Sequence, residues 1–207
     1  MATAPTDPQI RQRVPASVRR DALIAAAVHE FAHGGLHGTP VDRIARRVGV
    51  AQPYVFSLFG SKKELFLAAI ERDFALVGES FARAARGFEP ADEPQEADAP
   101  PDVFKAMGAA YVELLHSDPD LLMLQHQAYA ACDDPELRAR VRALYARLVA
   151  QVEGLAAAAS ERLGEPPPTA ERIDEFFRYG MWINVAAAMG VEDLSAGCEW
   201  MRAQGDK

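Results

Sequence analysis

The chain has 207 residues, of which 49% are hydrophobic and 25% are charged, so it is long enough for one large domain or for a small domain joined to a larger one. No apolar run reaches the roughly 18 residues of a membrane span and no signal-peptide core follows the first residues, so we expect a soluble, cytoplasmic protein without membrane contact. The only two cysteines, Cys132 and Cys198, lie far apart in the sequence, which argues against a zinc site or a disulfide.

The charge is divided unevenly along the chain, although the total is −8. Residues 1–63 hold nine Lys and Arg against four Asp and Glu, whereas residues 64–207 hold thirteen against twenty-six. A basic segment joined to an acidic one is typical of a DNA-binding domain attached to a domain that does not bind DNA. We therefore expect a disordered tail at residues 1–16, a DNA-binding domain at residues 17–63 and a second domain at residues 64–207.

The tail contains three prolines and no sustained periodicity. A mobile, solvated tail is a simpler interpretation than a basic arm in which Arg11 and Arg13 reach DNA.

A first helix is expected from Ser17 to about His33, where two glycines should end it. His29, His33 and His37 recur at intervals of four, as metal ligands on one helix face would. Because the glycines should turn His37 away from that face, we expect no metal site.

Residues 39–65 have the pattern of two short helices followed by a longer one. Thr39 is expected to cap the first of these two short helices, and Gly49 is expected to end that helix. A second helix is predicted at about residues 52–58. Its candidate buried residues are Val55, Phe56 and Phe59. Residues 61–64 form a Ser-x-x-Glu capping box that should begin the third helix. Two short helices separated by a glycine turn are typical of the helix-turn-helix unit that reads DNA.

The sequence from Val41 to Leu65 reads Val-Asp-Arg-Ile-Ala-Arg-Arg-Val-Gly-Val-Ala-Gln-Pro-Tyr-Val-Phe-Ser-Leu-Phe-Gly-Ser-Lys-Lys-Glu-Leu. This phrase resembles the TetR family of transcriptional regulators, including the tail aromatic-x-x-Phe-x-Ser-Lys-x-x-Leu. The resemblance extends over roughly residues 17–70. Members usually carry Ser or Thr where this chain has Ala51, so its recognition helix should lack a side-chain cap. They usually carry Tyr where this chain has Phe56, so a hydroxyl contact to phosphate is absent.

The helix starts and the resemblance select seven residues for DNA contact: Thr39, Arg43, Gln52, Pro53, Tyr54, Ser57 and Lys62. Gln52 and Tyr54 lie in the first turn of the recognition helix, where base edges are read, and Gln pairs with adenine. Pro53 offers an apolar surface to a thymine methyl group. Ser57 and Thr39 are assigned to phosphates, Arg43 to a phosphate or a base, and Lys62 to a phosphate at a helix start.

The remainder of the chain is predicted to be helical and has no strand pattern. Its expected helices cover residues 61–86, 102–117, 121–131, 136–163, 169–189 and 192–202, with an acidic, Pro-rich loop at 88–101. Asp134 with Asp133 could suggest a metal-diphosphate motif, but an Asp before a Pro is better explained as a helix cap. The predicted fold is all-α with about nine helices.

Eight residues of the second domain are candidates for a small-molecule site: Met107, Tyr111, His116, Met123, His126, Tyr129, Phe177 and Trp182. They combine apolar surface with isolated polar groups, as ligand pockets do, although each alone is more simply a core residue. The resemblance supplies the stronger argument, because the variable helical body of TetR-like proteins binds the inducer.

The helix expected at residues 169–189 is apolar nearly all round, which favours a second copy of the chain as its partner. Together these observations and the resemblance predict a homodimeric repressor that binds an inverted-repeat, double-stranded operator and is released by a small, largely apolar effector. No catalytic constellation or cofactor motif is evident, so we expect no enzymatic activity and no cofactor. The alternative is an all-helical ligand carrier or enzyme with an incidental helix-turn-helix.

Overall fold

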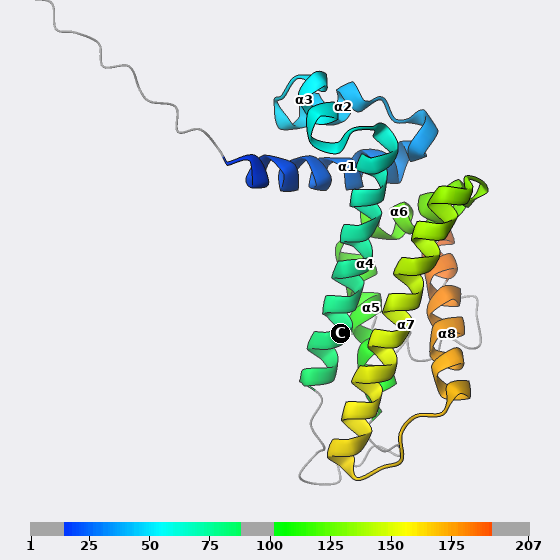
Figure 1. Cartoon of the computed structure of the whole chain (residues 1–207). Helices are drawn as coiled ribbons and strands as arrows, with labels where there is room; N and C mark the ends of the chain where they lie inside the picture. The colour runs from blue at the N-terminus through cyan, green and yellow to red at the C-terminus, as the bar shows by residue number, and fades with distance from the viewer. Residues whose placement is uncertain (1–14, 88–101, 192–207) are drawn as a thin grey trace, which may run out of the picture.

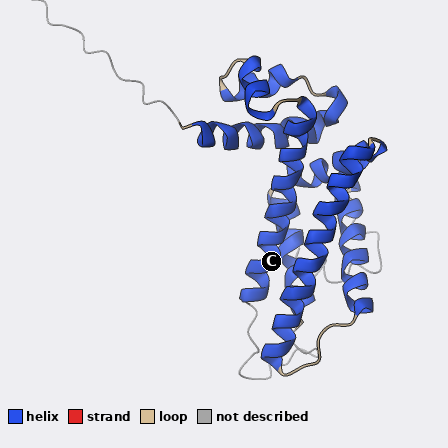
Figure 2. Ribbon diagram, in the orientation of Figure 1, coloured by secondary structure: helices blue, strands red, loops and turns tan. Residues whose placement is uncertain are grey.

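The computed structural model describes residues 15–87 and 102–191, and the described chain is helical with short turns and no strand (Figures 1 and 2). Eight α-helices and one 3-10 turn occur there: α1 Ala16–Gly38, α2 Val41–Val48, α3 Gln52–Phe59, α4 Lys62–Arg86, α5 Val103–Ser117, α6 Pro119–Ala130, η1 Ala131–Asp133, α7 Pro135–Leu163 and α8 Ala170–Met189. The predicted all-α class is therefore confirmed. The tail before residue 15, the expected loop at 88–101 and the expected helix at 192–202 lie outside the described residues.

The helices form two parts that share one long element. In Figure 1, α4, α5, α7 and α8 stand as an upright bundle, α1 lies across its upper end, and α2 and α3 lie above α1. The helix α1 packs on α6 and α4 as well as on α2. We call α1–α3 together with the first turn of α4 the head, and the rest of α4 together with α5–α8 the body. None of the described helices is long and apolar enough to cross a bilayer.

Most predicted helix ends are confirmed by the backbone geometry. Gly49 ends α2 in the left-handed conformation, with φ at 73°, which a residue without Cβ adopts without strain. Ser61 caps α4 by accepting a hydrogen bond from the Glu64 amide at 3.1 Å. Asp134 caps α7 by accepting from the amides of residues 136 and 137, so its role as a cap is confirmed. Ala51 precedes α3 without a side-chain cap, as expected.

The prediction that Thr39 caps α2 is wrong. Pro40 occupies the N-cap position, and the Thr39 side chain points inward, where its hydroxyl donates to the Glu30 carbonyl at 3.0 Å. The residue is 1% exposed. Thr39 therefore ties the start of α2 to α1 instead of capping it.

The first helix runs further than expected, because α1 continues to Gly38 across a kink at Gly35. Gly35 has φ at 61°, which favours glycine. A Cβ there would lie 2.5 Å from the Gln127 Oε1 of α6, so the small residue also allows a close approach. The kink lets the chain leave α1 and turn towards α2 while α1 remains packed on the body.

The stripe predicted along α4 is confirmed as core, since all five of its residues are buried: Phe66, Ile70, Phe74, Val77 and Phe81. Burial of each large apolar side chain contributes about 1.5–3 kcal/mol. Phe66 packs edge-to-face on Phe31 of α1, with the ring centroids 5.0 Å apart. One face of α4 therefore holds the head at its first turns and the body along the rest of its length.

Candidate functional site

The exposed surface of α3 is the first candidate site. Gln52, Pro53 and Ser57 are exposed and Tyr54 is half-buried, with the Arg19 guanidinium 5.9 Å from its ring centroid. The Ser57 hydroxyl donates to the Tyr54 carbonyl at 2.7 Å, so its oxygen remains able to accept. The first turn of α3 therefore presents an amide, a proline ring and part of a phenol together.

The prediction that Phe56 is buried is wrong, since its side chain is 39% exposed. The helix α3 packs through Val55 and Phe59, which lie one turn apart and are both buried. Phe56 follows Val55 directly and so points about 100° away from that face. The structure therefore adds an exposed aromatic residue to the surface of α3.

Two basic residues expected at this surface have partners within the head. Lys62 Nζ donates to the His37 carbonyl at 3.1 Å, and partial burial lowers the pKa of Lys62. Arg43 Nε lies 3.6 Å from the Glu30 carboxylate and keeps more than half of its side chain exposed. Thr39 is buried, so its side chain is not placed for a phosphate contact.

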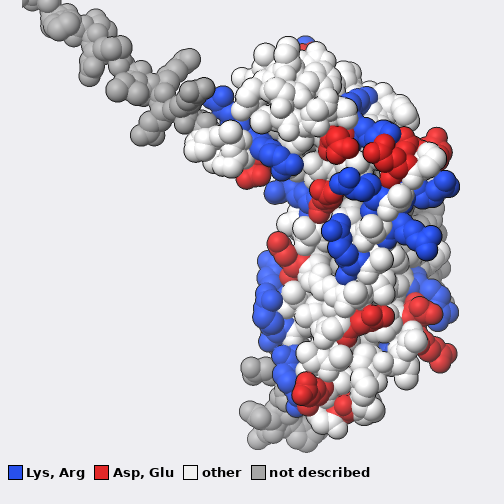
Figure 3. Space-filling model, in the orientation of Figure 1, with Lys and Arg blue, Asp and Glu red and all other residues white. Residues whose placement is uncertain are grey.

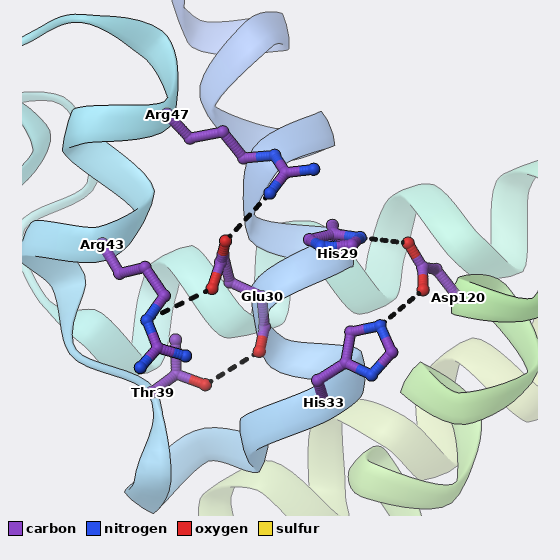
Figure 4. Close-up of polar contacts among 7 residues, drawn as sticks. All are labelled: His29, Glu30, His33, Thr39, Arg43, Arg47 and Asp120. Atoms are coloured by element: carbon purple, nitrogen blue, oxygen red, sulfur yellow. Dashed lines mark hydrogen bonds and ion pairs between the residues drawn. The ribbon is translucent and has the colours of Figure 1, made fainter.

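Ion pairs neutralise many of the other head cations. Arg47 lies 3.1 Å from Glu30 (Figure 4), Arg46 lies 2.9 Å from Asp42, and Lys63 lies 2.8 Å from Asp134. Figure 3 shows Lys and Arg along α1 and around the junction with the body, mixed with acidic side chains, while the upper face over α2 and α3 is largely uncharged in that view. The basic excess of the head is therefore only partly available to a partner.

The second candidate site is a cavity of about 520 Å³ inside the body, bounded by α4, α5, α6, α7 and α8. Its walls are largely aromatic and aliphatic: Phe74, Val77, Phe81, Phe104, Tyr145, Leu148, Phe176 and Phe177. Lys105 and Glu175, both exposed, and Arg172, partly exposed, also line it, so the cavity reaches the surface between α5 and α8. Arg172 is held there by Asp102 at 2.5 Å and Glu175 at 2.6 Å.

A buried polar network forms another part of the cavity wall through Tyr111 and Gln125. The Tyr111 hydroxyl donates to Gln125 Oε1 at 2.9 Å, and Gln125 Nε2 donates to Asp73 Oδ1 at 3.2 Å. Asn184 Nδ2 donates to the Tyr111 oxygen at 2.9 Å and to Gln125 Oε1 at 2.7 Å. The network thus links one residue from each of α4, α5, α6 and α8.

Two atoms of this network have no hydrogen-bond partner among the described residues, Asp73 Oδ2 and Asn184 Oδ1. Asp73 is fully buried and forms no ion pair among the described residues, so burial raises the pKa of its carboxyl to about 8. Burial likewise raises the pKa of Tyr111. The network therefore favours a neutral, protonated Asp73 at neutral pH.

Three of the eight predicted ligand residues line this cavity: Tyr111, Tyr129 and Phe177. The other five do not. Met107 is fully buried in the core, His116 is exposed, and Met123 is half-buried and packs against the core. His126 is partly buried, with its Nε2 3.3 Å from the Asn184 carbonyl. Trp182 is 42% exposed on the outer face of α8, because the inward face of that helix carries Ile183 and Asn184 instead.

The outer face of α8 is the third candidate site. Three large apolar side chains are exposed there by 37–59%: Trp182, Val185 and Met189. They lie three and four residues apart, so they form one stripe. Met181 is 37% exposed and also lines the cavity. The prediction that this helix has more apolar surface than one chain buries agrees with this stripe.

A polar cluster joins the head to the body (Figure 4). His29 Nδ1 lies 2.6 Å from Asp120 Oδ2, and His33 Nε2 lies 3.0 Å from Asp120 Oδ1. His37 is not part of the cluster. The third member comes from α6, which the spacing of histidines along α1 does not reveal.

Comparisons with known proteins agree with the geometry of the head. Residues 23–69 match the family model of bacterial regulatory proteins of the tetR family. The HTH-type transcriptional activator FasR from Mycolicibacterium smegmatis is 42% identical over 60 residues, which are 29% of this chain. The match spans only 27% of the length of that relative.

Solved structures extend the likeness to the body. A TetR-like transcriptional regulator from Rhodococcus sp. RHA1 has a TM-score of 0.59 at 22% identity, covering 86% of this chain and 88% of the other. The regulator FadR from Bacillus subtilis, solved in complex with stearoyl-CoA, has a TM-score of 0.62 at 16% identity, covering 86% and 98%. The fatty acid degradation regulator FadR from Bacillus halodurans has a TM-score of 0.64 at 17% identity, covering 86% of each.

The match to the tetR family is therefore confined to residues 23–69, and the likeness of the body to TetR-like regulators is one of fold.

Proposed function

We propose that this protein is a homodimeric transcriptional regulator that binds an inverted-repeat operator and is released from it by a ligand in the body. The observation that carries the proposal is the helix-turn-helix of α2 and α3, within residues 23–69, whose first α3 turn exposes Gln52 and Pro53. A short helix held by its neighbours and exposed at its first turn is the arrangement that enters a major groove.

The proposed contacts follow the placement of each side chain. Gln52 and Tyr54 contact base edges, with Pro53 and Phe56 supplying apolar surface to thymine methyl groups. Ser57, Arg43 and Lys62 serve phosphates or, for Arg43, a base. Lys62 must release the His37 carbonyl to do so, and Arg43 must loosen its 3.6 Å contact with Glu30. Thr39 contributes only through its position at the start of α2.

Dimerisation through α8 supplies the second reading head. One recognition helix reads too few base pairs for a unique genomic site, so two heads at a fixed spacing are needed. The stripe of Trp182, Val185 and Met189 is the apolar surface proposed to pack on its counterpart in a second copy.

The proposed ligand has a long apolar part and a polar or anionic end. The cavity falls within the volume range of ligand pockets, about 300–1,000 Å³. Its aromatic walls suit an acyl chain, and Lys105 and Arg172 lie where the cavity reaches the surface. A carboxylate or phosphate there would compete with Glu175 and Asp102 for Arg172. The stearoyl-CoA bound by the Bacillus subtilis structural relative supports this ligand class.

The helix α4 provides the proposed coupling between cavity and head. It begins at Lys62 beside the recognition helix and continues to Phe74, Val77 and Phe81 in the cavity wall. About 18 Å of continuous helix separate Lys62 from Phe74. A ligand that favours a different position of α4 changes the spacing of the two heads, and it releases DNA to the extent that it prefers that state.

The regulatory sign proposed is repression. The relative FasR is named an activator, so activation is the alternative outcome, and transcription from an operator-bearing promoter with and without the protein separates the two.

The test of DNA binding is selection of bound duplexes from random DNA by the purified protein. We expect an inverted repeat, with affinity that falls steeply with salt because phosphate contacts release counterions. Gln52→Ala should relax preference at one or two positions of each half-site, by about 1–3 kcal/mol per lost bidentate pair. No enriched sequence and no salt dependence would favour the helical carrier or enzyme instead.

A further inference from the structure

We propose that His29, His33 and Asp120 form a binding site for a divalent transition-metal ion of the zinc class, bridging α1 of the head and α6 of the body. One donor atom from each residue lies within 4.8 Å of the other two. Nothing in the proposed DNA or ligand site uses these residues.

The two histidines are placed by helix geometry. They lie four residues apart on α1, so both side chains project from the same face, and their ring centroids are 5.0 Å apart. The segment His29-Glu30-Phe31-Ala32-His33 has the His-Glu-x-x-His spacing that puts two imidazoles on one metal ion. The Glu of this segment has another role here. Glu30 turns to the opposite side, towards Arg43 and Arg47 (Figure 4). The arrangement is therefore a binding site without the neighbouring general base of a metalloprotease.

The third donor comes from Asp120 in the first turn of α6. Each of its oxygens faces one imidazole nitrogen, at 2.6 Å from His29 Nδ1 and 3.0 Å from His33 Nε2. Among the described residues, no Lys or Arg forms an ion pair with Asp120, so the carboxylate is free of a competing cation. Ligands about 2.0–2.2 Å from a tetrahedral zinc lie roughly 3.3 Å apart, so the His33 and Asp120 donors need to separate by about 0.3 Å and the His29 and Asp120 donors by about 0.7 Å.

The donor set selects the class of ion. Two imidazole nitrogens and one carboxylate oxygen suit Zn²⁺, Co²⁺ or Ni²⁺, whereas Mg²⁺ and Ca²⁺ prefer oxygen ligands. His33 is 61% exposed and the other two side chains are partly exposed, so water reaches the remaining coordination positions. Since the donors come from both α1 and α6, a bound ion fixes the head against the body, independently of α4.

The experiment uses the full chain without a polyhistidine tag, freed of metal, and titrates it with Zn²⁺ and with Co²⁺. We expect one ion per chain and a Zn²⁺-dependent rise in melting temperature. His33→Ala and Asp120→Asn should each weaken Zn²⁺ binding at least roughly 10-fold, because loss of a ligand costs no less than loss of an outer-shell partner. Mg²⁺ should not bind at the concentrations at which Zn²⁺ saturates the site.

The matched control is His37→Ala, which removes the remaining histidine of the four-residue series without touching the cluster, and it should leave Zn²⁺ affinity unchanged. A Cys132→Ser/Cys198→Ser variant should also bind normally, and the Co²⁺ spectrum should lack thiolate bands. Circular dichroism of each metal-free variant establishes that it is folded. Failure of the wild-type chain to bind Zn²⁺, or equal binding by folded His33→Ala and wild type, would overturn the proposal and leave the cluster as a hydrogen-bonded contact between α1 and α6.

Discussion

Among the described residues, head and body each bury one carboxylate, and the surroundings of the two are opposite. In the head, Glu30 is 7% exposed and faces the guanidinium groups of Arg43 and Arg47. In the body, Asp73 is fully buried and accepts a hydrogen bond from the Gln125 amide, while its other oxygen has no partner in the described part of the chain. The first acid clamps α1 to α2 by charge, whereas the second is part of a network at the cavity wall.

This difference suggests that the two carboxyl groups have different structural roles. A carboxylate held by two cations fixes the geometry of a reading unit, whose exposed residues must keep their positions relative to DNA. A buried carboxyl without a cation is costly to ionise, and an unsatisfied polar atom near a cavity is a place where a ligand or a water molecule can add a hydrogen bond. This contrast supports the proposal that the head reads DNA and the body responds to a ligand.

Asp73→Asn tests whether the buried carboxyl of the body is neutral, and it has the largest expected effect. Since the folded pKa of Asp73 is raised to about 8, its stabilising neutral form is fully present below the unfolded pKa of about 4. Stability should fall as pH rises through that window, by about 1.4 kcal/mol per pH unit and at most roughly 5 kcal/mol. Asn cannot ionise, so the stability of the variant should not fall with pH in this way.

Thermal unfolding from pH 4 to 9 measures the effect, with Glu79→Gln, an exposed position on the same helix, as the control. Parallel profiles for wild type and Asp73→Asn would mean that Asp73 is ionised in the folded chain.

Trp182→Glu breaks the proposed link between two copies of the body. A charge in the apolar stripe of α8 should separate the dimer and lower operator affinity by roughly 100-fold or more, since the two heads no longer bind as one unit. Sedimentation equilibrium measures the dimer and fluorescence anisotropy the operator. Trp182→Phe should preserve both. A stable Trp182→Glu dimer with normal operator affinity would place the interface elsewhere.

Glu30→Gln tests whether the ion pairs of the buried carboxylate in the head hold α1 against α2. Loss of the charge leaves Arg43 and Arg47 without their shared partner, and since both are about half exposed we expect a loss of about 1–2 kcal/mol in stability. Asp42→Asn, which breaks only the exposed pair with Arg46, should cost less than about 0.5 kcal/mol. Equal small losses in the two variants under urea unfolding would show that Glu30 does not clamp the head.

Lys62→Ala has the smallest expected effect and asks whether a partnered head cation still serves DNA. If Lys62 leaves the His37 carbonyl for a phosphate, the variant should weaken operator and random DNA alike and reduce the salt slope by about one. Lys63→Ala is the control, because Lys63 is paired with Asp134 and Glu136 of the body. An unchanged slope in Lys62→Ala would leave Lys62 a structural residue that binds the end of α1.

The elements that could be predicted from the sequence are those set by residues close together in the chain. Gly49, the Ser61 capping box and the Asp134 cap each act within one helical turn, and the apolar stripe of α4 depends on one helix alone. The outward position of Phe56 required knowledge of which face of α3 packs, which depends on neighbouring helices.

The polar sites could not be predicted because their members come from distant helices. Asp73, Gln125 and Asn184 lie on three different helices, and the only indication of them in the sequence is a polar residue on an otherwise apolar helix face. Asp120 joins His29 and His33 across the junction of α1 and α6. The spacing of His29 and His33 around Glu30 is visible in the sequence, but the third donor, Asp120, lies on another helix, so the sequence alone predicts no metal site.

Reciprocal binding is the sharpest test of the proposed control of the head by the body cavity through α4. The affinity of stearoyl-CoA is measured by calorimetry with and without saturating operator duplex, and operator affinity is measured with and without stearoyl-CoA. We expect each partner to weaken the other by the same factor, about 5- to 150-fold, which corresponds to a coupling of about 1–3 kcal/mol. Tight binding of stearoyl-CoA in the cavity with identical affinities in the presence and absence of operator would contradict it.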